Sequence, residues 1–479
     1  MTPLNLKLGV VFAFTILVRV VFHYLTGFIA DDAFITFRYA ENIASGLGFV
    51  YNEGQRVLGT TTPLFALLLS ALALIKIPPP SAALLISLIS SGLTACMLFR
   101  FAISLRFTTW SIVPVVVYAL WPRSLPADTG GMETALFTLL ITAGFYFQHK
   151  KLDYYAMGMA TLATVTRPEG TLLLLLLVLV NWWQRKDQWL SYIIIPLVII
   201  GPWLVFEWYY FGAIIPNSAA GKLALYSRFG TMSLIDTVIF LMGWHTIGGW
   251  LITIAAVFGG IWLNRKQNFG WLEIIWMLSM LVFFAASGAR MFFWYIVPIY
   301  PVLILFATAM LPWLAEKLSI SPARLPQVRN VVVVLGGLLL IAGCYKPMAY
   351  YKDFQQAMDQ MHRSIGLYLA QQGHRDDLVA AEDVGYMGYY SEMRILDRDG
   401  LVSPEAIPYN RSGDYFGLIR DYSPEWVVAA PSSPTSGFVA DSAFVSLYEP
   451  RKNFPYGDLG YTVYARRAGE AGESITGQD

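Results

Sequence analysis

Long runs of apolar residues recur along this chain, and they restrict its fold more than any other feature. A helix of about 20 apolar residues, rising about 1.5 Å per residue, is long enough to cross the roughly 30 Å hydrocarbon core of a bilayer. Eleven such runs, some slightly short, lie near residues 8–29, 82–105, 109–122, 132–148, 153–166, 169–183, 189–211, 248–263, 271–287, 291–314 and 330–345. The sequence therefore predicts a membrane all-α fold with about eleven transmembrane helices.

Two apolar segments need separate treatment. The first run lacks a small-residue cleavage site and is longer than the core of a signal peptide, so we expect it to remain as a true span. The segment from Pro63 to Lys76 has 14 residues, which as a helix would cover only about 21 Å. It is followed by Pro78, Pro79 and Pro80. We predict that this segment is re-entrant or interfacial.

Lysine and arginine predict the orientation, because basic residues concentrate in short cytoplasmic loops. With eleven spans and a cytoplasmic N-terminus, the cytoplasmic side receives Lys7, Arg100, Arg106, Lys150, Lys151, Arg185, Lys186, Arg265, Lys266, Lys317, Arg324 and Arg329. Counting the segment after Pro63 as a twelfth span would place every later basic turn outside. We therefore expect a multi-pass protein of the cell (inner or plasma) membrane with its C-terminal part on the outer face.

The chain changes character after Tyr345, where the long apolar runs end. Residues 346–479 carry 12 Lys and Arg against 19 Asp and Glu, so this part is acidic. Strand-like pieces are expected at 378–381, 393–396, 426–429, 444–448 and 461–465, with a helical stretch over 351–371. The predicted domains are a polytopic membrane domain over 1–345 with its first outer loop at 30–81, an extracytoplasmic α/β domain over 346–470 and a disordered tail over 471–479.

Asp31 and Asp32 stand directly after the first apolar run. One aspartate can cap the helix expected at 33–45, whereas two adjacent carboxylates at a bilayer surface indicate a substrate site. The helix dipole keeps such a carboxylate ionised, which suits a group that accepts a proton from an incoming hydroxyl. The alternative is that both residues merely cap a surface helix. A short hairpin is expected at 49–57, and Arg38 and Glu41 are expected to pair locally.

Other polar side chains lie at the outer ends of the predicted spans. They are Arg123, Asp128, Arg167, Glu169, Asn217, Lys222, His245 and Arg290. A lone arginine at a span end is more often an anchor than a ligand, but several such groups converging on an acidic loop favour a charged cavity. Arg19, in the middle of the first span, is expected in a buried pair. Asp397 and Asp399, in the segment DRDG, are typical of a turn at a strand end.

Adjacent carboxylates also suit a divalent cation. Asp31 and Asp32, together with Asp128 or Glu169, could supply oxygen ligands for Mg²⁺ or Mn²⁺. No cofactor is firmly expected, and a site without metal stays open as the alternative. The only two cysteines lie in apolar surroundings and predict no disulfide framework, and the formal net charge of +1 implies no nucleic-acid partner.

Several motifs occur in a defined order over most of the chain. They are DDAFITFRYAENIASGLGFVYNEGQRVLGTTTPLFALLL, GGMETALF, TRPEG, IPNSAAGKL, RMFFWYIVP and DVGYMGYYSEMRILDRDGLVSPE. In these motifs the chain resembles the polytopic glycosyltransferases of the C superfamily (GT-C fold), especially bacterial cell-wall arabinofuranosyltransferases and related mannosyltransferase-like membrane proteins. The resemblance implies a membrane hexosyl- or pentosyltransferase that moves a sugar from a polyprenyl phosphate to a cell-envelope glycan, lipid or protein on the outer face.

The resemblance also implies roles for single residues. Asp31, which takes the position of the leading carboxylate, would be the general base, and Asp32 would orient the sugar or the acceptor; the reverse assignment of the two stays open. The candidates for binding the donor phosphate are, in order, Lys222, Arg290 and Arg167. The candidates for binding substrate are Asp128, Glu169, Asn217 and His245. Two other functions stay open, a lipid or polysaccharide transporter or flippase, and a surface receptor whose tail binds glycans.

Overall fold

The structure, a computed structural model, describes residues 3–184, 189–229, 233–243, 246–286, 292–457 and 459–467. The chain divides into two compact units. The helical unit comprises Met1–Ala30, Thr61–Ile214 and Gly230–Asp353, and the mixed unit comprises Asp31–Thr60, Ile215–Phe229 and Phe354–Asp479. The tail predicted to be disordered, 471–479, lies outside the described residues.

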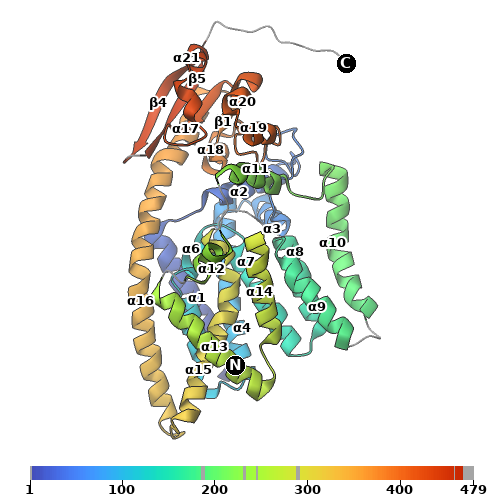
Figure 1. Cartoon of the computed structure of the whole chain (residues 1–479), viewed down its shortest axis with the longest axis vertical. Helices are drawn as coiled ribbons and strands as arrows, with labels where there is room; N and C mark the ends of the chain where they lie inside the picture. The colour runs from blue at the N-terminus through green and yellow to red at the C-terminus, as the bar shows by residue number, and fades with distance from the viewer. Residues whose placement is uncertain are drawn as a thin grey trace. The chain divides into compact units, whose positions relative to one another are not determined.

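The helical unit is built from apolar helices that pack against one another (Figure 1). They are α1 (Pro3–Thr26), α3 (Pro63–Leu74), α4 (Pro79–Ser104), η1 (Thr108–Ile112), α5 (Val113–Ala119), α6 (Ser124–Thr129), α7 (Thr134–His149), α8 (Asp153–Thr166), α9 (Gly170–Gln184), α10 (Trp189–Phe211), α12 (Leu234–Met242), α13 (Ile247–Gln267), α14 (Trp271–Ala286), η3 (Phe293–Tyr295), η4 (Val297–Ile299), α15 (Tyr300–Lys317) and most of α16 (Leu325–Met358). Helix α7 contacts α4 and α8, and α13 packs on α15. This last approach requires Gly259, because a Cβ there would lie 1.9 Å from the carbonyl oxygen of Phe306.

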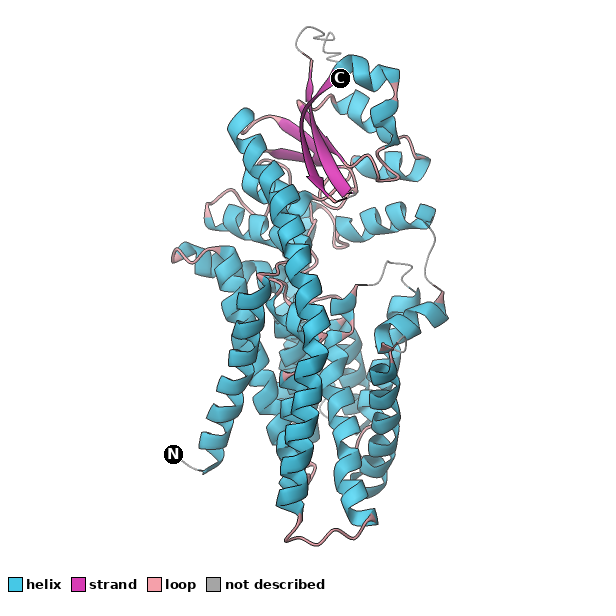
Figure 2. Ribbon diagram, turned by 90° about the vertical axis from the view of Figure 1, so that its left-hand side faces the viewer, coloured by secondary structure: helices cyan, strands magenta, loops and turns pink. Residues whose placement is uncertain are grey.

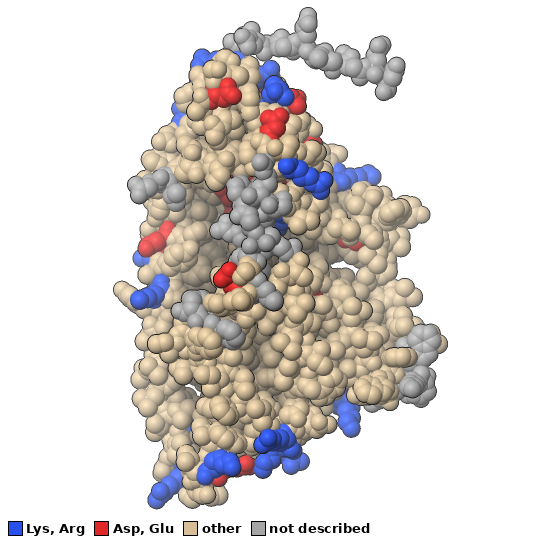
Figure 3. Space-filling view, viewed as in Figure 1, with Lys and Arg blue, Asp and Glu red and all other residues tan. Residues whose placement is uncertain are grey.

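Six helices in the described part of the chain are long and apolar enough to cross a membrane. They are Pro3–Thr26, Pro79–Ser104, Tyr192–Phe211, Ile247–Gln267, Phe293–Lys317 and Leu325–Gln372. Other predicted spans form shorter apolar helices, such as Gly170–Gln184 and Trp271–Ala286, so the total of eleven stays a prediction. On the face shown in Figure 3, the helical unit carries few charged side chains along its helices, and Lys and Arg gather at one end.

The mixed unit contains a five-stranded sheet in the order β2-β1-β3-β5-β4 (Figure 2). Its strands are β1 (Leu378–Ala381), β2 (Arg394–Asp397), β3 (Trp426–Ala429), β4 (Tyr448–Tyr456) and β5 (Leu459–Arg466). Strand β1 is parallel to β2 and β3, with Val379 opposite Ile395 on one side and Trp426 on the other, whereas β5 is antiparallel to β3 and β4. The carboxyl ends of the three parallel strands therefore meet at one edge of the sheet.

Short helices surround this sheet. Helix α16 continues through the π-helical turn η5 (Asp359–Arg363) into α17 (Ser364–Gln372), and the others are α18 (Val384–Ser391), α19 (Ala406–Ser412), α20 (Tyr415–Tyr422), η6 (Gly437–Ala440) and α21 (Ser442–Leu447). Two helices come from distant parts of the chain, α2 (Asp31–Ala44) against α18 and α11 (Asn217–Phe229) against α19 (Figure 1). The apolar core includes Leu396, Ile419, Val427 and Phe444.

The predictions for the C-terminal strands are confirmed in part. β1 and β3 have the predicted bounds, and β2 and β5 differ from the predicted ranges by at most two residues. The strand predicted at 444–448 is wrong, because α21 occupies most of it. The N-cap of α21 is Asp441, whose side chain accepts a hydrogen bond from the Ala443 N–H at 2.8 Å. β4 was missed, since Pro450 and Pro455 interrupt any strand pattern and are tolerated only because β4 is an edge strand.

The division of the chain also differs from the predicted boundary between residues 345 and 346. Helix α16 runs through that position without a break. The loop Asp31–Thr60 was assigned to the membrane domain, but it groups with the residues after Phe354. Residues 49–57 form bends and turns in place of the predicted hairpin. Hydrogen bonds from this loop to the C-terminal segment explain the grouping.

Candidate active site

The first loop begins with α2, which combines an acidic N-terminus with an aromatic buried face. Phe34, Phe37 and Tyr39 are almost completely buried. The ring of Phe34 packs on Tyr386 of α18 with the ring centroids 4.0 Å apart. Aspartate in the first turn is favoured by the helix dipole, and the aromatic face anchors the rest of the helix. The predicted helix at 33–45 is therefore confirmed, and it begins at the aspartate pair.

Arg38 of α2 binds backbone oxygens far along the chain. Its guanidinium donates to the carbonyl oxygen of Gly388 at 2.7 Å and to that of Met393 at 2.6 Å. The predicted local pair with Glu41 is wrong, since Glu41 instead accepts a hydrogen bond from the hydroxyl of Tyr389. A buried guanidinium needs several acceptors, and the end of α18 supplies them.

Two further side chains of the loop bind the same segment. The Asn52 amide donates to the Ile395 carbonyl at 2.8 Å and accepts from the Ile395 N–H at 3.0 Å, so it pairs with the outer edge of β2. The Tyr51 hydroxyl donates to the Val384 carbonyl at 2.6 Å. A Cβ on Gly388 would lie 1.8 Å from this hydroxyl oxygen, so only glycine fits there. The loop is thus an integral part of the mixed unit.

Asp31 caps helix α18. Its two carboxylate oxygens accept hydrogen bonds from the backbone N–H of Gly385 at 3.0 Å and of Tyr386 at 2.9 Å. Asp383 occupies the N-cap position of α18, yet its side chain makes no capping hydrogen bond. Gly385 is required here, because a Cβ would lie 2.0 Å from the Asp31 carbonyl oxygen. Asp31 therefore does the work of an N-cap for a helix that starts more than 350 residues later.

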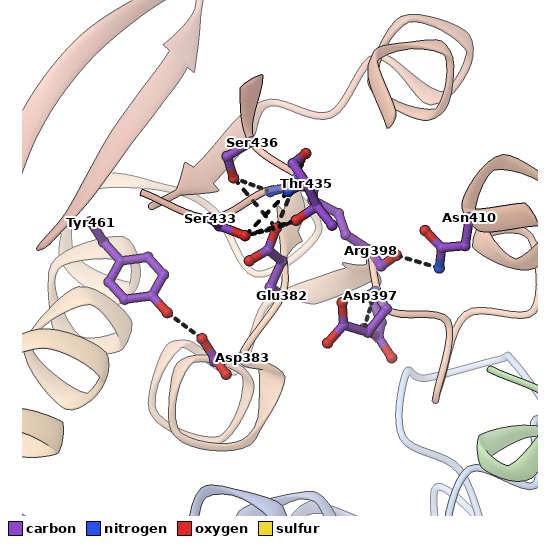
Figure 4. Close-up of polar contacts among 10 residues, drawn as sticks. Glu382, Asp383, Asp397, Arg398, Asn410, Ser433, Thr435, Ser436 and Tyr461 are labelled. Carbon is purple, nitrogen blue, oxygen red and sulfur yellow. Dashed lines mark hydrogen bonds and ion pairs between the residues drawn. The ribbon is translucent and has the colours of Figure 1, made fainter. Parts of the chain in front are cut away.

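His362, in the π-helical turn, lies between Asp31 and Asp383. Its Nδ1 is 3.6 Å from Asp31 Oδ1, and its Nε2 is 3.9 Å from Asp383 Oδ2. The residue is 4% exposed. The hydroxyl of Tyr461 donates to Asp383 (Figure 4). Burial raises the pKa of Asp383 above the ordinary aspartate value, and the charge of His362 opposes that rise.

Asp32 and Lys222 form the more open part of the site. Lys222 Nζ lies 3.9 Å from Asp32 Oδ2, and the two side chains are 23% and 35% exposed respectively. Burial raises the pKa of Asp32 above its ordinary value, Lys222 opposes the shift and the neighbouring Asp31 adds to it. A carboxylate with a raised pKa is a stronger proton acceptor than an ordinary aspartate. The structure therefore brings together two residues that the sequence singled out 190 positions apart.

Lys222 is held in place by the first turn of α11. The side-chain amide of Asn217 donates to the carbonyl oxygens of Gly400 at 2.8 Å and Leu401 at 3.0 Å. Its backbone N–H donates to the carbonyl oxygen of Leu58 at 2.8 Å. A Cβ on Gly221 would lie 2.6 Å from the Gly400 oxygen, so the helix approaches that loop closely. Asn217 was predicted to bind substrate, but its amide is used to fasten α11.

Arg167 and Glu169 belong to the helical unit and bind each other. Arg167 Nη2 lies 3.0 Å from Glu169 Oε1, and Nη1 lies 3.4 Å from Glu133 Oε1. All three side chains are buried. Two carboxylates already neutralise this guanidinium, so neither the predicted phosphate-binding role of Arg167 nor the predicted substrate-binding role of Glu169 fits the arrangement.

Asp128 is also held in a buried pair within the helical unit. Its Oδ2 accepts from Arg19 Nη2 at 2.9 Å, and both side chains are completely buried. Arg19 also donates to the Ala119 carbonyl oxygen at 2.7 Å. The predicted buried pair of Arg19 is confirmed. Asp128 was predicted to bind substrate, but it has no exposed surface for one.

Two predicted site residues, Arg290 and His245, lie outside the described residues. Within the described ranges, no group of three or more His, Cys, Asp or Glu side chains is arranged to hold a metal ion. The predicted ligands Asp128 and Glu169 each bind an arginine instead. A divalent cation at the aspartate pair stays an untested expectation.

The carboxyl ends of the parallel strands carry a second polar cluster (Figure 4). Arg398 Nη2 lies 3.1 Å from Glu382 Oε1 and donates to the Thr435 carbonyl oxygen at 2.6 Å. Asp397 accepts from the backbone N–H of Asp399 at 2.9 Å and of Val402 at 2.8 Å. Burial raises the pKa of Asp397 to about 7, and these hydrogen bonds oppose the rise. The predicted turn in DRDG is confirmed. The contacts of this cluster hold together the loops that follow β1, β2 and β3.

Sequence reasoning missed His362 and Tyr461. Neither residue stands in a recognisable motif, and each is surrounded in the sequence by ordinary amphipathic or strand residues. Only the π-helical turn brings His362 to Asp31, and only the pairing of β5 brings Tyr461 to Asp383, so no local signal could have identified them.

Two solved structures share the fold of this chain. The crystal structure of ArnT from Cupriavidus metallidurans bound to undecaprenyl phosphate has a TM-score of 0.63 and 13% sequence identity, covering 98% of this chain and 99% of that one. The apo structure of the same protein has a TM-score of 0.62 and 14% identity, covering 96% and 98%. The chain therefore has the GT-C fold that the motifs resemble, a multi-pass membrane fold with a C-terminal α/β unit.

Sequence comparison adds one match. Residues 349–467 match a family described as a domain of unknown function (DUF8728). This region covers the C-terminal segment of the mixed unit and includes His362, Asp383 and Tyr461. No curated protein sequence matches the chain.

Proposed function

We propose that the chain is a membrane glycosyltransferase that moves a sugar from a polyprenyl-phosphate donor to a hydroxyl of a cell-envelope glycan, lipid or protein on the outer face. One observation carries the proposal, namely the partly exposed pair of Asp32 and Lys222 at 3.9 Å. A proton acceptor next to a fixed cation is the combination that transfer from a phosphate ester needs.

In the proposed reaction, the acceptor oxygen attacks the anomeric carbon of the donor. The bond between that carbon and the phosphate oxygen breaks, and the acceptor proton passes to Asp32. The lipid phosphate leaves with the negative charge of the broken bond, which the ammonium group of Lys222 stabilises. A single displacement of this kind inverts the anomeric centre.

Asp32 fits the base role better than Asp31. Both oxygens of Asp31 already accept backbone N–H groups of Gly385 and Tyr386. These bonds would have to break before Asp31 could take up a proton at the same lone pairs. Asp32 is more exposed. We therefore assign the base to Asp32 and the orienting role to Asp31, which reverses the preference between the two aspartates.

Binding of the donor would also raise the proton affinity of Asp32. In the unliganded site Lys222 lowers the proton affinity of Asp32. A bound phosphate would draw the ammonium charge to itself, and Asp32 would become the stronger base at the moment the donor is present. The GT-C fold and the undecaprenyl phosphate bound to ArnT support a polyprenyl phosphate as the lipid part of the donor.

The direct test is sugar transfer by the purified protein in lipid vesicles, using a panel of synthetic polyprenyl-phosphate sugars and mass spectrometry of the acceptor fraction. We expect a covalent glycoside with the wild type, its formation about 100-fold slower or more with Asp32→Asn, and a strongly reduced amount with Lys222→Gln. The exposed pair Lys266 and Glu316 of the helical unit offers a matched control, because Lys266→Gln removes the same charge there.

Three outcomes would count against the proposal. Full activity in both Asp32→Asn and Asp31→Asn would remove the catalytic assignment. Movement of the lipid-linked sugar across the vesicle membrane without any covalent product would favour a transporter or flippase. Loss of activity in chelator, with recovery on adding Mg²⁺ or Mn²⁺, would add a metal to the site and require a different role for Lys222.

A further inference from the structure

His362 lies where three elements of the mixed unit converge. It belongs to the π-helical turn Asp359–Arg363, between α16 and α17, and it is almost completely buried. The two charged ends of the turn, Asp359 and Arg363, pair with each other at 3.7 Å, and their side chains are 42% and 49% exposed. A π-helical turn is rare and often marks a functional position, because the extra residue redirects one side chain. The buried residues of this turn are Met361 and His362, and the histidine is the titratable one.

The titratable groups that face the imidazole come from three different elements. Asp31 at the start of α2 lies 3.6 Å from Nδ1, and Asp383 before α18 lies 3.9 Å from Nε2. Tyr461 of β5 contacts the ring edge-on, with the ring centroids 5.1 Å apart, and donates its hydroxyl to Asp383. The imidazole is thus enclosed by two carboxylates, one at each nitrogen.

A neutral imidazole carries a proton on only one of its nitrogens, so it can donate to only one of these carboxylates. The imidazolium donates from both nitrogens and neutralises part of the charge on each carboxylate. Both distances exceed the roughly 3.2 Å limit of a good hydrogen bond, so small ring movements decide how tightly each carboxylate is held. A change in the protonation state of His362 would therefore change how firmly Asp31 is held.

Asp31 passes this restraint on to the reacting carboxylate. It is hydrogen-bonded to the start of α18 and is the chain neighbour of Asp32. If Asp31 turns away from α18, the first turn of α2 moves and the Asp32 carboxylate moves with it. Displacements of about 1 Å at a reacting group can lower a rate about 100-fold.

We propose that His362 is a positioning residue, whose protonated form holds Asp31 against α18 and thereby sets the place of the Asp32 carboxylate. This inference rests on the proposed function for its kinetic consequence. That consequence is a loss of kcat on the alkaline side, as the imidazole releases its proton, with little change in KM for the donor.

Two amide substitutions separate the two nitrogens. In His362→Asn the amide nitrogen takes a place near Nδ1 and can still donate toward Asp31, whereas in His362→Gln it lies near Nε2 and serves Asp383. At the pH optimum of the wild type, where Asp32 is ionised and His362 still carries its proton, we expect kcat to fall about tenfold or more in His362→Gln, and less in His362→Asn. The alkaline fall of kcat should disappear in both variants. His374→Gln, at an exposed histidine of the same unit, is the matched control.

A second measurement does not depend on activity. Hydrogen exchange followed by mass spectrometry reports on the amides of Gly385 and Tyr386, which the Asp31 carboxylate protects. After correction for intrinsic exchange, these amides should exchange faster in His362→Gln than in the wild type at acidic pH. In the wild type their protection should fall as the imidazole loses its proton, and His374→Gln should behave like the wild type.

The two readouts separate failure of this inference from failure of the proposed function. A wild type that transfers sugar, together with His362 variants that keep its alkaline limb and its amide protection, would overturn the positioning role. A wild type without transferase activity, whose amide protection nevertheless follows His362, would leave the restraint in place and overturn the proposed function. Thermal unfolding of each variant shows whether a lost signal reflects an unfolded protein.

Discussion

Asp31 takes the capping position at helix α18 that Asp383, the residue directly before that helix, leaves unfilled. The carboxylate of Asp31 binds the N–H groups of Gly385 and Tyr386, and Asp383 faces His362 and Tyr461 instead. Asp31, one of the two adjacent aspartates, therefore has a structural role. Replacing Asp31 and replacing Asp32 should for this reason have different effects.

Asp31→Ala should destabilise the protein by about 1–2 kcal/mol, the usual effect of removing an N-cap, because two N–H groups lose their acceptor. Asp31→Asn should lose less, since the amide oxygen can still accept. Thermal unfolding in detergent is the measurement, with Asp376→Ala at an exposed aspartate as the control. An Asp31→Ala protein as stable as the control would show that the cap is energetically silent.

Asp32→Asn should leave the fold intact and remove transfer. Loss of a general base lowers a rate about 10²- to 10⁴-fold, whereas removal of a carboxylate whose pKa is raised by burial should not lower the melting temperature at neutral pH. Asp32→Glu keeps the acid and should retain part of the activity. The assay is single-turnover transfer from a saturating donor, beside an unfolding measurement on the same sample.

The pH dependence follows from the same residue. A base works when it is ionised, so a raised pKa moves the acidic limb of kcat/KM to a higher pH than an ordinary aspartate would give. Because Lys222 opposes the rise, Lys222→Gln should move that limb further up, and Lys222→Arg should leave it nearly in place. The limb is read from kcat/KM measured across the acidic range, and a downward shift in Lys222→Gln would contradict this electrostatic account.

The Asp32 carboxyl also affects the stability of the fold, and this effect changes with pH in the direction opposite to its effect on activity. A carboxyl whose folded-state pKa is raised binds its proton more tightly in the folded protein, so its contribution is fully present below the ordinary aspartate value and is lost as pH rises through the folded-state pKa. Asp32→Asn removes this contribution. The difference in melting temperature between the variant and the wild type should therefore move in favour of the variant as pH rises from about 4 toward neutrality.

Arg38 should be sensitive to a conservative exchange. Its guanidinium donates to two carbonyl oxygens, and the hydrogen bonds of a buried charged group are worth about 1.5–3 kcal/mol each. Arg38→Lys keeps the charge but cannot reach both acceptors, so we expect a loss of about 2 kcal/mol. Arg420→Lys, at an exposed arginine, is the control. Equal melting temperatures of the two variants would contradict the structural role of Arg38.

The buried pair of Arg19 and Asp128 gives a prediction for the helical unit. Arg19→Met alone leaves a buried carboxylate without its cation, which costs about 3–5 kcal/mol. The double substitution Arg19→Met with Asp128→Leu removes both charges and should recover most of that loss. Unfolding of the four proteins in a double-mutant cycle measures the coupling, and additive effects would show that the pair does not interact.

Local sequence signals were sufficient where the structure is locally determined. Helix α2, strands β1 and β3 and the turn at Asp397 follow from capping, strand pattern and turn chemistry. The same signals failed where contacts with distant parts of the chain determine the structure. β4 forms at the sheet edge despite Pro450 and Pro455. Proline has no N–H to donate, and an edge strand tolerates this because it has a partner strand on one side only.

The features of the candidate site likewise fall into those that the sequence indicates and those that only the packing determines. The aspartate pair stands out in the sequence because carboxylates are rare beside a membrane span. The sequence could not reveal that Arg167 is neutralised by Glu133 and Glu169, or that Asn217 fastens α11, since those partners are set by packing. It also could not rank Asp31 against Asp32, because the N–H groups that distinguish them belong to α18.

The bond between Asn52 and Ile395 joins positions 343 residues apart. During synthesis the early loop leaves the ribosome long before the edge strand that it completes. Until that strand arrives, the loop has no partner for Asn52, Arg38 or Tyr51. A chain cut short before its last quarter would lack these partners. We therefore expect the proposed site not to form in such a chain, and the truncated protein to show no transfer at all.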